Sequence, residues 1–207
     1  MSLHHQLQQR ERDNNPIRVA LIGAGKFGAM YLAQVPRTPG VHLAGIADLS
    51  LASAKTNLAR VGWPEHQSQA KSLDEAFKQR QTFLTEDWRS LVSDPRIDVV
   101  VECTGNPIAA VEHCLAAFEH GKHVVNVTVE ADAFCGPLLA RKAALAGVVY
   151  SLAFGDQPAL ICDLVDWART CGLPVVAAGR GHKWLPHFSE STPDTVWGNY
   201  GLTPEQA

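Results

Sequence analysis

The sequence predicts an α/β protein built on a doubly wound parallel sheet. Apolar runs of strand length alternate with segments of helical periodicity along most of the chain. The first apolar run, residues 17–22, leads directly into a glycine-rich stretch, residues 23–28, that reads GAGKFG. An acidic residue, Asp48, follows the second apolar run. These three observations are typical of a Rossmann-type sheet, which binds a dinucleotide at the carboxyl ends of its strands.

The elements follow from periodicity and from turn residues. Because strands and helices alternate, the crossovers are expected to be right-handed and the strands parallel. Strands are expected at residues 17–22, 41–47, 82–84 (weak), 97–101, 123–129, 148–150 and 174–178. Helices are expected to fill the intervals, at about residues 27–35, 51–61, 73–78, 87–92, 107–120, 133–146 and 157–170.

The two ends of the chain lack this alternation. Residues 1–15 are polar and are expected to form a flexible, loosely attached arm. Residues 16–179 form the predicted dinucleotide-binding domain. Residues 180–207 contain prolines and have no sustained periodicity, so they are expected to start a second, truncated domain.

The glycine stretch fits the GxGxxG pattern of a dinucleotide-binding turn. Gly23 would permit the tight turn off the strand, Gly25 the approach of a pyrophosphate, and Gly28 close packing of the next helix. The N–H groups at the start of that helix, where Lys26 and Phe27 lie, would hold the diphosphate. A glycine-rich turn that binds nothing is the alternative.

Asp48 follows Gly28 by 20 residues, where the fingerprint expects an acid that accepts hydrogen bonds from the adenosine ribose. A carboxylate there repels a 2′-phosphate, which favours NAD over NADP, although NADP stays open. The alternative is a helix cap, in which Asp48 or Ser50 caps the helix that follows.

A second strand end carries Thr104, Gly105 and Asn106. Ligands of open parallel sheets sit outside the carboxyl ends of the strands, so this turn is expected to contact the nicotinamide-side ribose or the diphosphate. Asn106 is also a good N-cap, and Pro107 is a good first helical residue. An ordinary strand-to-helix turn is the alternative.

Composition excludes several classes of function. The net charge of −3 and the pI of about 6.3 do not favour nucleic acid as a partner. No apolar run approaches the ~20 residues that span a bilayer, so no membrane association is expected. The five cysteines form no CxxC pair, which predicts reduced thiols in a cytoplasmic protein. His182, His187 and Glu190 fit no ligand spacing, so no metal is expected.

Several blocks together resemble homoserine-dehydrogenase-like NAD(P)-dependent oxidoreductases, and within them the SAF-domain-containing, deoxyxylulose-phosphate-reductoisomerase-like group. The blocks are IGAGKFG, VECTGNP, NVTVEAD, GVVYSLAFGDQPA, AGRGHKWLP and STPDTVWG. The resemblance implies a Rossmann domain followed by a substrate and dimerisation domain. A homodimer is expected to form through that C-terminal domain, most of which is expected to be missing from this chain. Two positions depart from it: Thr128 stands where Asn is usual, and Arg180 where Lys is usual. Both departures put the substrate-side contacts in doubt.

Three residues are candidates for the catalytic step. Lys183 could bind the substrate or polarise its carbonyl group, and Glu130 and Asp156 could position it or transfer the proton that hydride transfer requires. Simpler roles compete with each of these. Asp156 could be only an N-cap, Glu130 the start of a loop, and Lys183 a solvated cation.

The sequence therefore predicts the cofactor-binding part of an oxidoreductase. Hydride would pass between the nicotinamide and a small, polar or phosphorylated carbonyl or alcohol substrate. The main alternative is a module that binds or senses NAD(H) without catalysis, because one fold hosts many functions. A third hypothesis, another adenosine-bearing ligand such as S-adenosylmethionine, fits the glycine pattern and Asp48 least well.

Overall fold

In a computed structural model, the structure describes residues 2–154, 157–179 and 185–201. The chain divides into two units, Met1–Asp156 and Gln157–Ala207. This division falls at the start of helix α8 (Gln157–Thr170), whereas the sequence predicts a boundary after residue 179.

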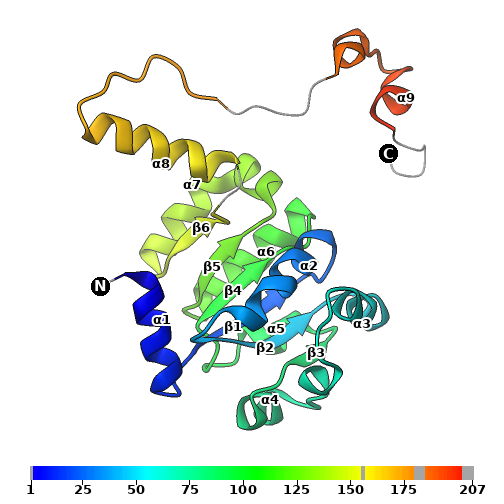
Figure 1. The fold of residues 1–207 in the computed structure, drawn as a ribbon, viewed down its shortest axis with the longest axis vertical. Coiled ribbons are helices and arrows are strands. Elements are labelled where there is room, and N and C mark those ends of the chain that lie inside the picture. The colour runs from blue at the N-terminus through cyan, green and yellow to red at the C-terminus, as the bar shows by residue number, and fades with distance from the viewer. Residues whose placement is uncertain (1, 155–156, 180–184, 202–207) are drawn as a thin grey trace. The chain divides into compact units, whose positions relative to one another are not determined.

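The first unit contains one sheet of six parallel strands in the order β3-β2-β1-β4-β5-β6 (Figure 1). The chain starts at the centre of the sheet, moves outward to β3, and returns to place β4 beside β1. This is the doubly wound Rossmann order, so the predicted fold class is confirmed. The strands are β1 (Ile17–Ile22), β2 (Val41–Ala47), β3 (Phe83–Thr85), β4 (Val99–Glu102), β5 (His123–Asn126) and β6 (Tyr150–Leu152).

Helices cover both faces of the sheet because the strands are apolar on both sides. Val19 and Leu21 of β1 pack with Leu32 and Leu58 on one face, whereas Ala20 and its neighbours pack against the other helices. The helices and 3₁₀ segments of this unit are α1 (Leu3–Arg12), α2 (Lys26–Gln34), η1 (Val35–Arg37), α3 (Leu51–Arg60), η2 (Glu65–Ser68), α4 (Leu73–Gln79), α5 (Trp88–Val92), α6 (Pro107–Glu119) and α7 (Val129–Leu145).

The N-terminal segment differs from its prediction as a flexible arm, since residues 3–12 form helix α1. The hydroxyl of Ser2 accepts a hydrogen bond from the N–H of His5 and caps the helix. A carboxylate oxygen of Glu11 then accepts from the N–H of Gly40 at 2.8 Å and pairs with Arg80 at 2.6 Å. These contacts join α1 to residues distant in sequence.

The second unit begins with helix α8. Helix α8 precedes residues 173–179, which have no regular secondary structure, so the strand predicted at 174–178 is wrong. The 3₁₀ segment η3 (Pro186–Glu190) and helix α9 (Val196–Tyr200) follow. A hydrogen bond of 3.1 Å joins Nε2 of His187 to the carbonyl of Asn199 and links these two short elements.

Candidate functional site

The glycine turn connects the carboxyl end of β1 to α2. Its three glycines differ in the atoms that a Cβ would contact. Gly23 has φ +93°, and a Cβ added there would lie 2.7 Å from the carbonyl oxygen of Cys103. A Cβ on Gly28 would lie 2.3 Å from the carbonyl oxygen of Gly23, so this glycine lets α2 pack against the turn. A Cβ on Gly25 would meet nothing within 4 Å. Gly25 is therefore the position that leaves open space in front of the backbone.

The peptide groups of Ala24, inside this turn, are held from two sides. The N–H of Ala24 donates to Oδ2 of Asp48 at 2.8 Å, and its carbonyl accepts from the side-chain amide of Asn57 at 2.8 Å. The other oxygen of Asp48 accepts from the N–H of Ser50 at 2.9 Å. The cap of α3 is Ser50, whose hydroxyl accepts from the N–H of Ser53. Asp48 thus shapes the turn, and each of its oxygens can accept a further hydrogen bond.

Asn57 is a site residue that the sequence reasoning missed. It lies in the second turn of α3, and the fingerprint contains no position for it. An amide on the helix that follows the acidic residue is the only local signal.

A cavity of about 370 Å³ opens in front of the glycine turn. It contains five of the predicted cofactor residues, namely Gly23, Gly25, Asp48, Thr104 and Asn106, together with Ile22, Ala47, Leu49, Glu86, Trp88, Cys103, Ala109, Glu112 and His113. The other four predicted residues, Lys26, Phe27, Gly28 and Gly105, are not part of its lining.

The turn after β4 begins α6 and closes another side of this cavity. The Oδ1 atom of Asn106 accepts from the N–H groups of Ile108 and Ala109, each at 3.1 Å, so Asn106 is the N-cap that the sequence predicts. Gly105 has φ +70°, a conformation that favours glycine, and its N–H donates to Oγ1 of Thr128 at 3.0 Å.

Beneath this turn lies a carboxylate that the sequence reasoning did not single out. Glu102, the last residue of β4, is fully buried. Its oxygens accept hydrogen bonds from Thr104, Thr128 and His113. An acid at the end of the otherwise apolar strand VVVE was the available signal.

A family model described as the NAD-binding domain of homoserine dehydrogenase matches residues 23–150, which include the glycine turn, Asp48 and the turn after β4. The chain belongs to this family. Membership confirms the predicted resemblance and NAD as the cofactor of the domain. A second family model, described as the catalytic domain of the oxidoreductase DRL, matches residues 155–205.

Solved structures of longer proteins share this fold. A homoserine dehydrogenase from Thiobacillus denitrificans is 26% identical over 66% of this chain, with a TM-score of 0.53. An NAD binding oxidoreductase from Klebsiella pneumoniae matches 76% of the chain at 24% identity, with a TM-score of 0.50, which supports the fold alone. The matches cover 29% and 39% of those two chains, so this chain spans well under half of either. A search of the curated proteins finds no match.

Of the three predicted catalytic residues, only Glu130 lies among the residues that the structure describes. Glu130 lies in the first turn of α7 and its side chain is exposed, outside the lining of the cavity. Asp156 and Lys183 lie outside the described residues, as does Arg180. Thr128 is buried and is hydrogen-bonded to Glu102 and to the N–H of Gly105.

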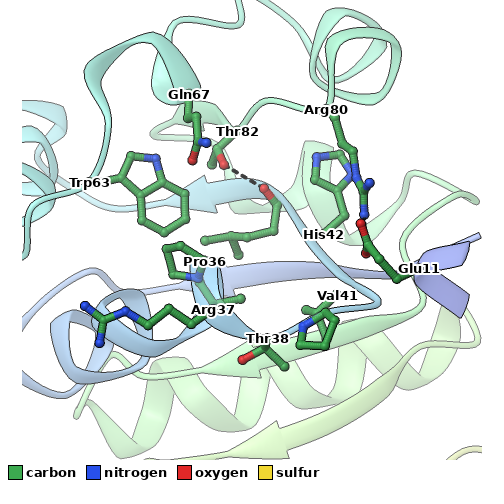
Figure 2. A pocket seen from close by; sticks show the side chains of 13 residues that line it. Glu11, Pro36, Arg37, Thr38, Val41, His42, Trp63, Gln67, Arg80 and Thr82 are labelled. Carbon is green, nitrogen blue, oxygen red and sulfur yellow. Dashed lines mark hydrogen bonds and ion pairs between the residues drawn. The ribbon is translucent and has the colours of Figure 1, made fainter. Parts of the chain in front are cut away.

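A second cavity, of about 400 Å³, lies at the other end of β2 (Figure 2). Its charged groups are mostly engaged with each other. Arg80 pairs with Glu11, and Nε2 of His42 donates to the carbonyl of Gln81 at 2.8 Å. Because His42 is near the start of β2 and Asp48 follows its end, this cavity is separate from the glycine turn.

The remaining predictions concern metals, membranes and thiols. In the described part of the chain, no cluster of three or more His, Cys, Asp or Glu side chains is arranged to hold a metal ion. Every helix among residues 2–154, 157–179 and 185–201 is too short or too polar to traverse a bilayer. All five cysteines are free. Burial raises the pKa of the Cys103 and Cys114 thiols to about 12 each.

Proposed function

We propose that this chain is the cofactor-binding part of an NAD-dependent oxidoreductase. The observation that carries the proposal is the glycine turn itself. Its Ala24 peptide groups are held by Asp48 and Asn57, while Gly25 leaves open space toward the cavity. The start of α2 has no side-chain cap, so its N–H groups are suited to a diphosphate.

The same cavity supports a preference for NAD over NADP. Asp48 lies at the end of β2, and Glu86 follows β3, the neighbouring strand. Both residues line the cavity, and a carboxylate near the adenosine ribose accepts hydrogen bonds from its hydroxyls but repels a 2′-phosphate. The fingerprint predicts only one acid at this site. A second acid, directly after the adjacent strand, strengthens the expectation that a 2′-phosphate is repelled.

The reaction proposed is hydride transfer between nicotinamide and a small, polar or phosphorylated carbonyl or alcohol compound. The cofactor supplies the hydride chemistry, and the protein binds and orients it. Lys183, Glu130 and Asp156 are proposed to bind the substrate and to supply the proton. The lengths of the related dehydrogenases support a substrate region formed by a further domain, through which two copies would associate.

The proposed location is the cytoplasm. Five cysteines without a disulfide are in keeping with a reducing compartment, where thiols stay reduced.

Calorimetric titration of the chain with NADH and NADPH tests the cofactor part of this proposal. We expect NADH to bind at least ~10-fold more tightly, equivalent to about 1.4 kcal/mol. Asp48→Asn should narrow or reverse that preference. Asp98→Asn is the matched control, because Asp98 also accepts a backbone N–H, that of Arg18 at 2.8 Å, but stands just before β4 at the opposite end of the strands.

Two results would separate the alternatives. Equal affinity for both nucleotides, or an equal effect of the two substitutions, contradicts the role of Asp48. Tight binding of NADH with no turnover of hydroxy or oxo compounds, even by a longer form that includes the further domain, favours the non-catalytic sensing module instead.

A further inference from the structure

The turn after β4 is organised by one buried carboxylate. Oε1 of Glu102 accepts from the N–H of Thr104 at 3.2 Å and from its hydroxyl at 2.5 Å. Oε2 accepts from the hydroxyl of Thr128. Glu102 is completely buried and Thr128 is 2% exposed, so water does not compete for the bond between these two side chains.

The two threonine hydroxyls connect the carboxylate to the backbone N–H groups of the next two residues of the turn. A hydroxyl has one proton to donate and two lone pairs that accept. Thr128 donates to Glu102 and therefore accepts from the N–H of Gly105, at 3.0 Å. Thr104 likewise donates to Glu102 and accepts from the N–H of Asn106, at 3.3 Å. Three successive backbone N–H groups are thus directed toward Glu102, one directly and two through a hydroxyl.

A fourth contact compensates the burial of the charge. Nδ1 of His113 donates to Oε1 of Glu102 at 3.2 Å, and the imidazole packs edge-on against Trp88 with ring centroids 4.5 Å apart. A buried carboxylate is tolerated when its lone pairs are filled in this way, and removal of one partner leaves an uncompensated charge. Both His113 and Trp88 line the cavity, so the network borders the candidate cofactor site directly.

We infer that Glu102 is a positioning residue that, through the hydroxyls of Thr104 and Thr128, fixes the turn at residues 104–106 against the nicotinamide half of NAD(H). The inference rests on the proposed function and extends it. Because the backbone N–H groups of the turn point to Glu102, the turn is suited to receive hydroxyl groups of a ribose and unsuited to hold a diphosphate. Of the two roles that the sequence leaves open for Thr104 and Gly105, the inference assigns the contact with the ribose.

The position of Thr128 supports this assignment. In this chain the hydroxyl is short enough to bridge Glu102 and the N–H of Gly105 while staying buried. A residue that only filled space at this position would need no such pair of bonds.

The test uses Thr128→Val, which removes the hydroxyl and keeps the shape of the side chain. Thr82→Val is the matched control. Thr82 is also 2% exposed, and its hydroxyl makes one buried hydrogen bond, to the carbonyl of Leu43 at 2.7 Å, in the other cavity (Figure 2). Thr128→Ser keeps the hydroxyl and should restore the wild-type behaviour. Glu102→Gln is a second variant that removes the charge and keeps the size.

The readout is the affinity of each variant for NADH and for ADP, measured by calorimetry on the whole chain. ADP lacks the nicotinamide and its ribose, so it reports only on the glycine turn and Asp48. We expect Thr128→Val to weaken NADH binding by about 10-fold while ADP binding stays within about twofold of wild type. Glu102→Gln should act in the same direction, whereas Thr128→Ser and Thr82→Val should bind both ligands as wild type does.

Contrary results fall into two groups. If wild type binds NADH and both Thr128→Val and Glu102→Gln bind it equally well, the inference is overturned and the proposed function stands. The same holds if the two variants lose NADH and ADP affinity by equal factors, because that indicates general disruption. If wild type binds no nucleotide, the proposed function fails as well. Should Thr128→Val not fold, Glu102→Gln and Thr128→Ser still provide the comparison.

Discussion

The two glycines at the start of α2 offer a sharp test of the cofactor site, because alanine at one should damage the fold and at the other only binding. A Cβ on Gly28 would lie 2.3 Å from the carbonyl oxygen of Gly23 and 3.2 Å from its carbonyl carbon. The closer distance is about 1 Å short of van der Waals contact. The neighbour is backbone and cannot rotate away, so α2 must shift. A Cβ on Gly25 meets nothing within 4 Å.

The sizes of the two effects follow from this geometry. Overpacking of this kind costs about 1–3 kcal/mol, which for a chain of this length lowers Tm by roughly 2–4 °C per kcal/mol. Gly28→Ala should therefore unfold roughly 2–12 °C below wild type. Gly25 has φ −72°, which alanine adopts without strain, so Gly25→Ala should keep the wild-type Tm. Its methyl group would occupy the approach of the diphosphate and weaken NADH binding by ~10-fold or more.

Thermal unfolding and calorimetric titration of both variants provide the measurement. The two effects are expected to separate, with a loss of stability in Gly28→Ala and a loss of affinity alone in Gly25→Ala. A Gly28→Ala protein with the wild-type Tm would refute the packing argument. A Gly25→Ala protein that binds NADH as wild type does would refute the assignment of the open space to the diphosphate.

Two further predictions rest on buried titratable groups. Burial lowers the pKa of His42 below its ordinary value of 6.5, against the opposing effect of its hydrogen bond to a carbonyl. The unfolded chain therefore binds more protons at this residue, so its contribution to stability is lost as the pH falls below about 6.5. Thermal unfolding between pH 7.5 and 5.5 should show a smaller loss of Tm for His42→Gln than for wild type, and an equal loss would contradict this reasoning. For the thiols, whose pKa burial raises to about 12, alkylation of the folded protein at pH 8 followed by mass spectrometry should leave Cys103 and Cys114 unmodified and should label the exposed Cys162 and Cys171.

The sheet could be predicted closely from the sequence where strands are buried on both faces. Strands β1 and β2 have the predicted bounds, 17–22 and 41–47, because a continuous apolar run between turn residues leaves little choice of conformation. The segment at 174–178 has the same apolar character but forms no strand. Local composition does not provide the neighbouring strand that pairing requires.

Helix α1 and the buried carboxylate show what such reasoning lacks. Residues 3–12 have no apolar stripe, and the partners of Glu11 lie 29 and 69 residues further along the chain. The partners of Glu102 include Thr128, which is 26 residues away. Single positions can be predicted to be polar or apolar, but contacts between distant side chains depend on the topology. The glycine turn was predictable because its glycines lie within six consecutive residues.

The two side-chain hydrogen bonds to the backbone of Ala24 affect how a ligand would bind to this domain. Its N–H and carbonyl are held by Asp48 and Asn57, two partners that the protein itself supplies. The conformational entropy of the glycine turn is therefore lost when the chain folds. It is not lost a second time when a ligand binds. A dinucleotide arriving at such a rigid turn would lose mainly its own freedom of motion. The affinity of the site would then depend on the contacts it offers, and little on rearrangement of its backbone.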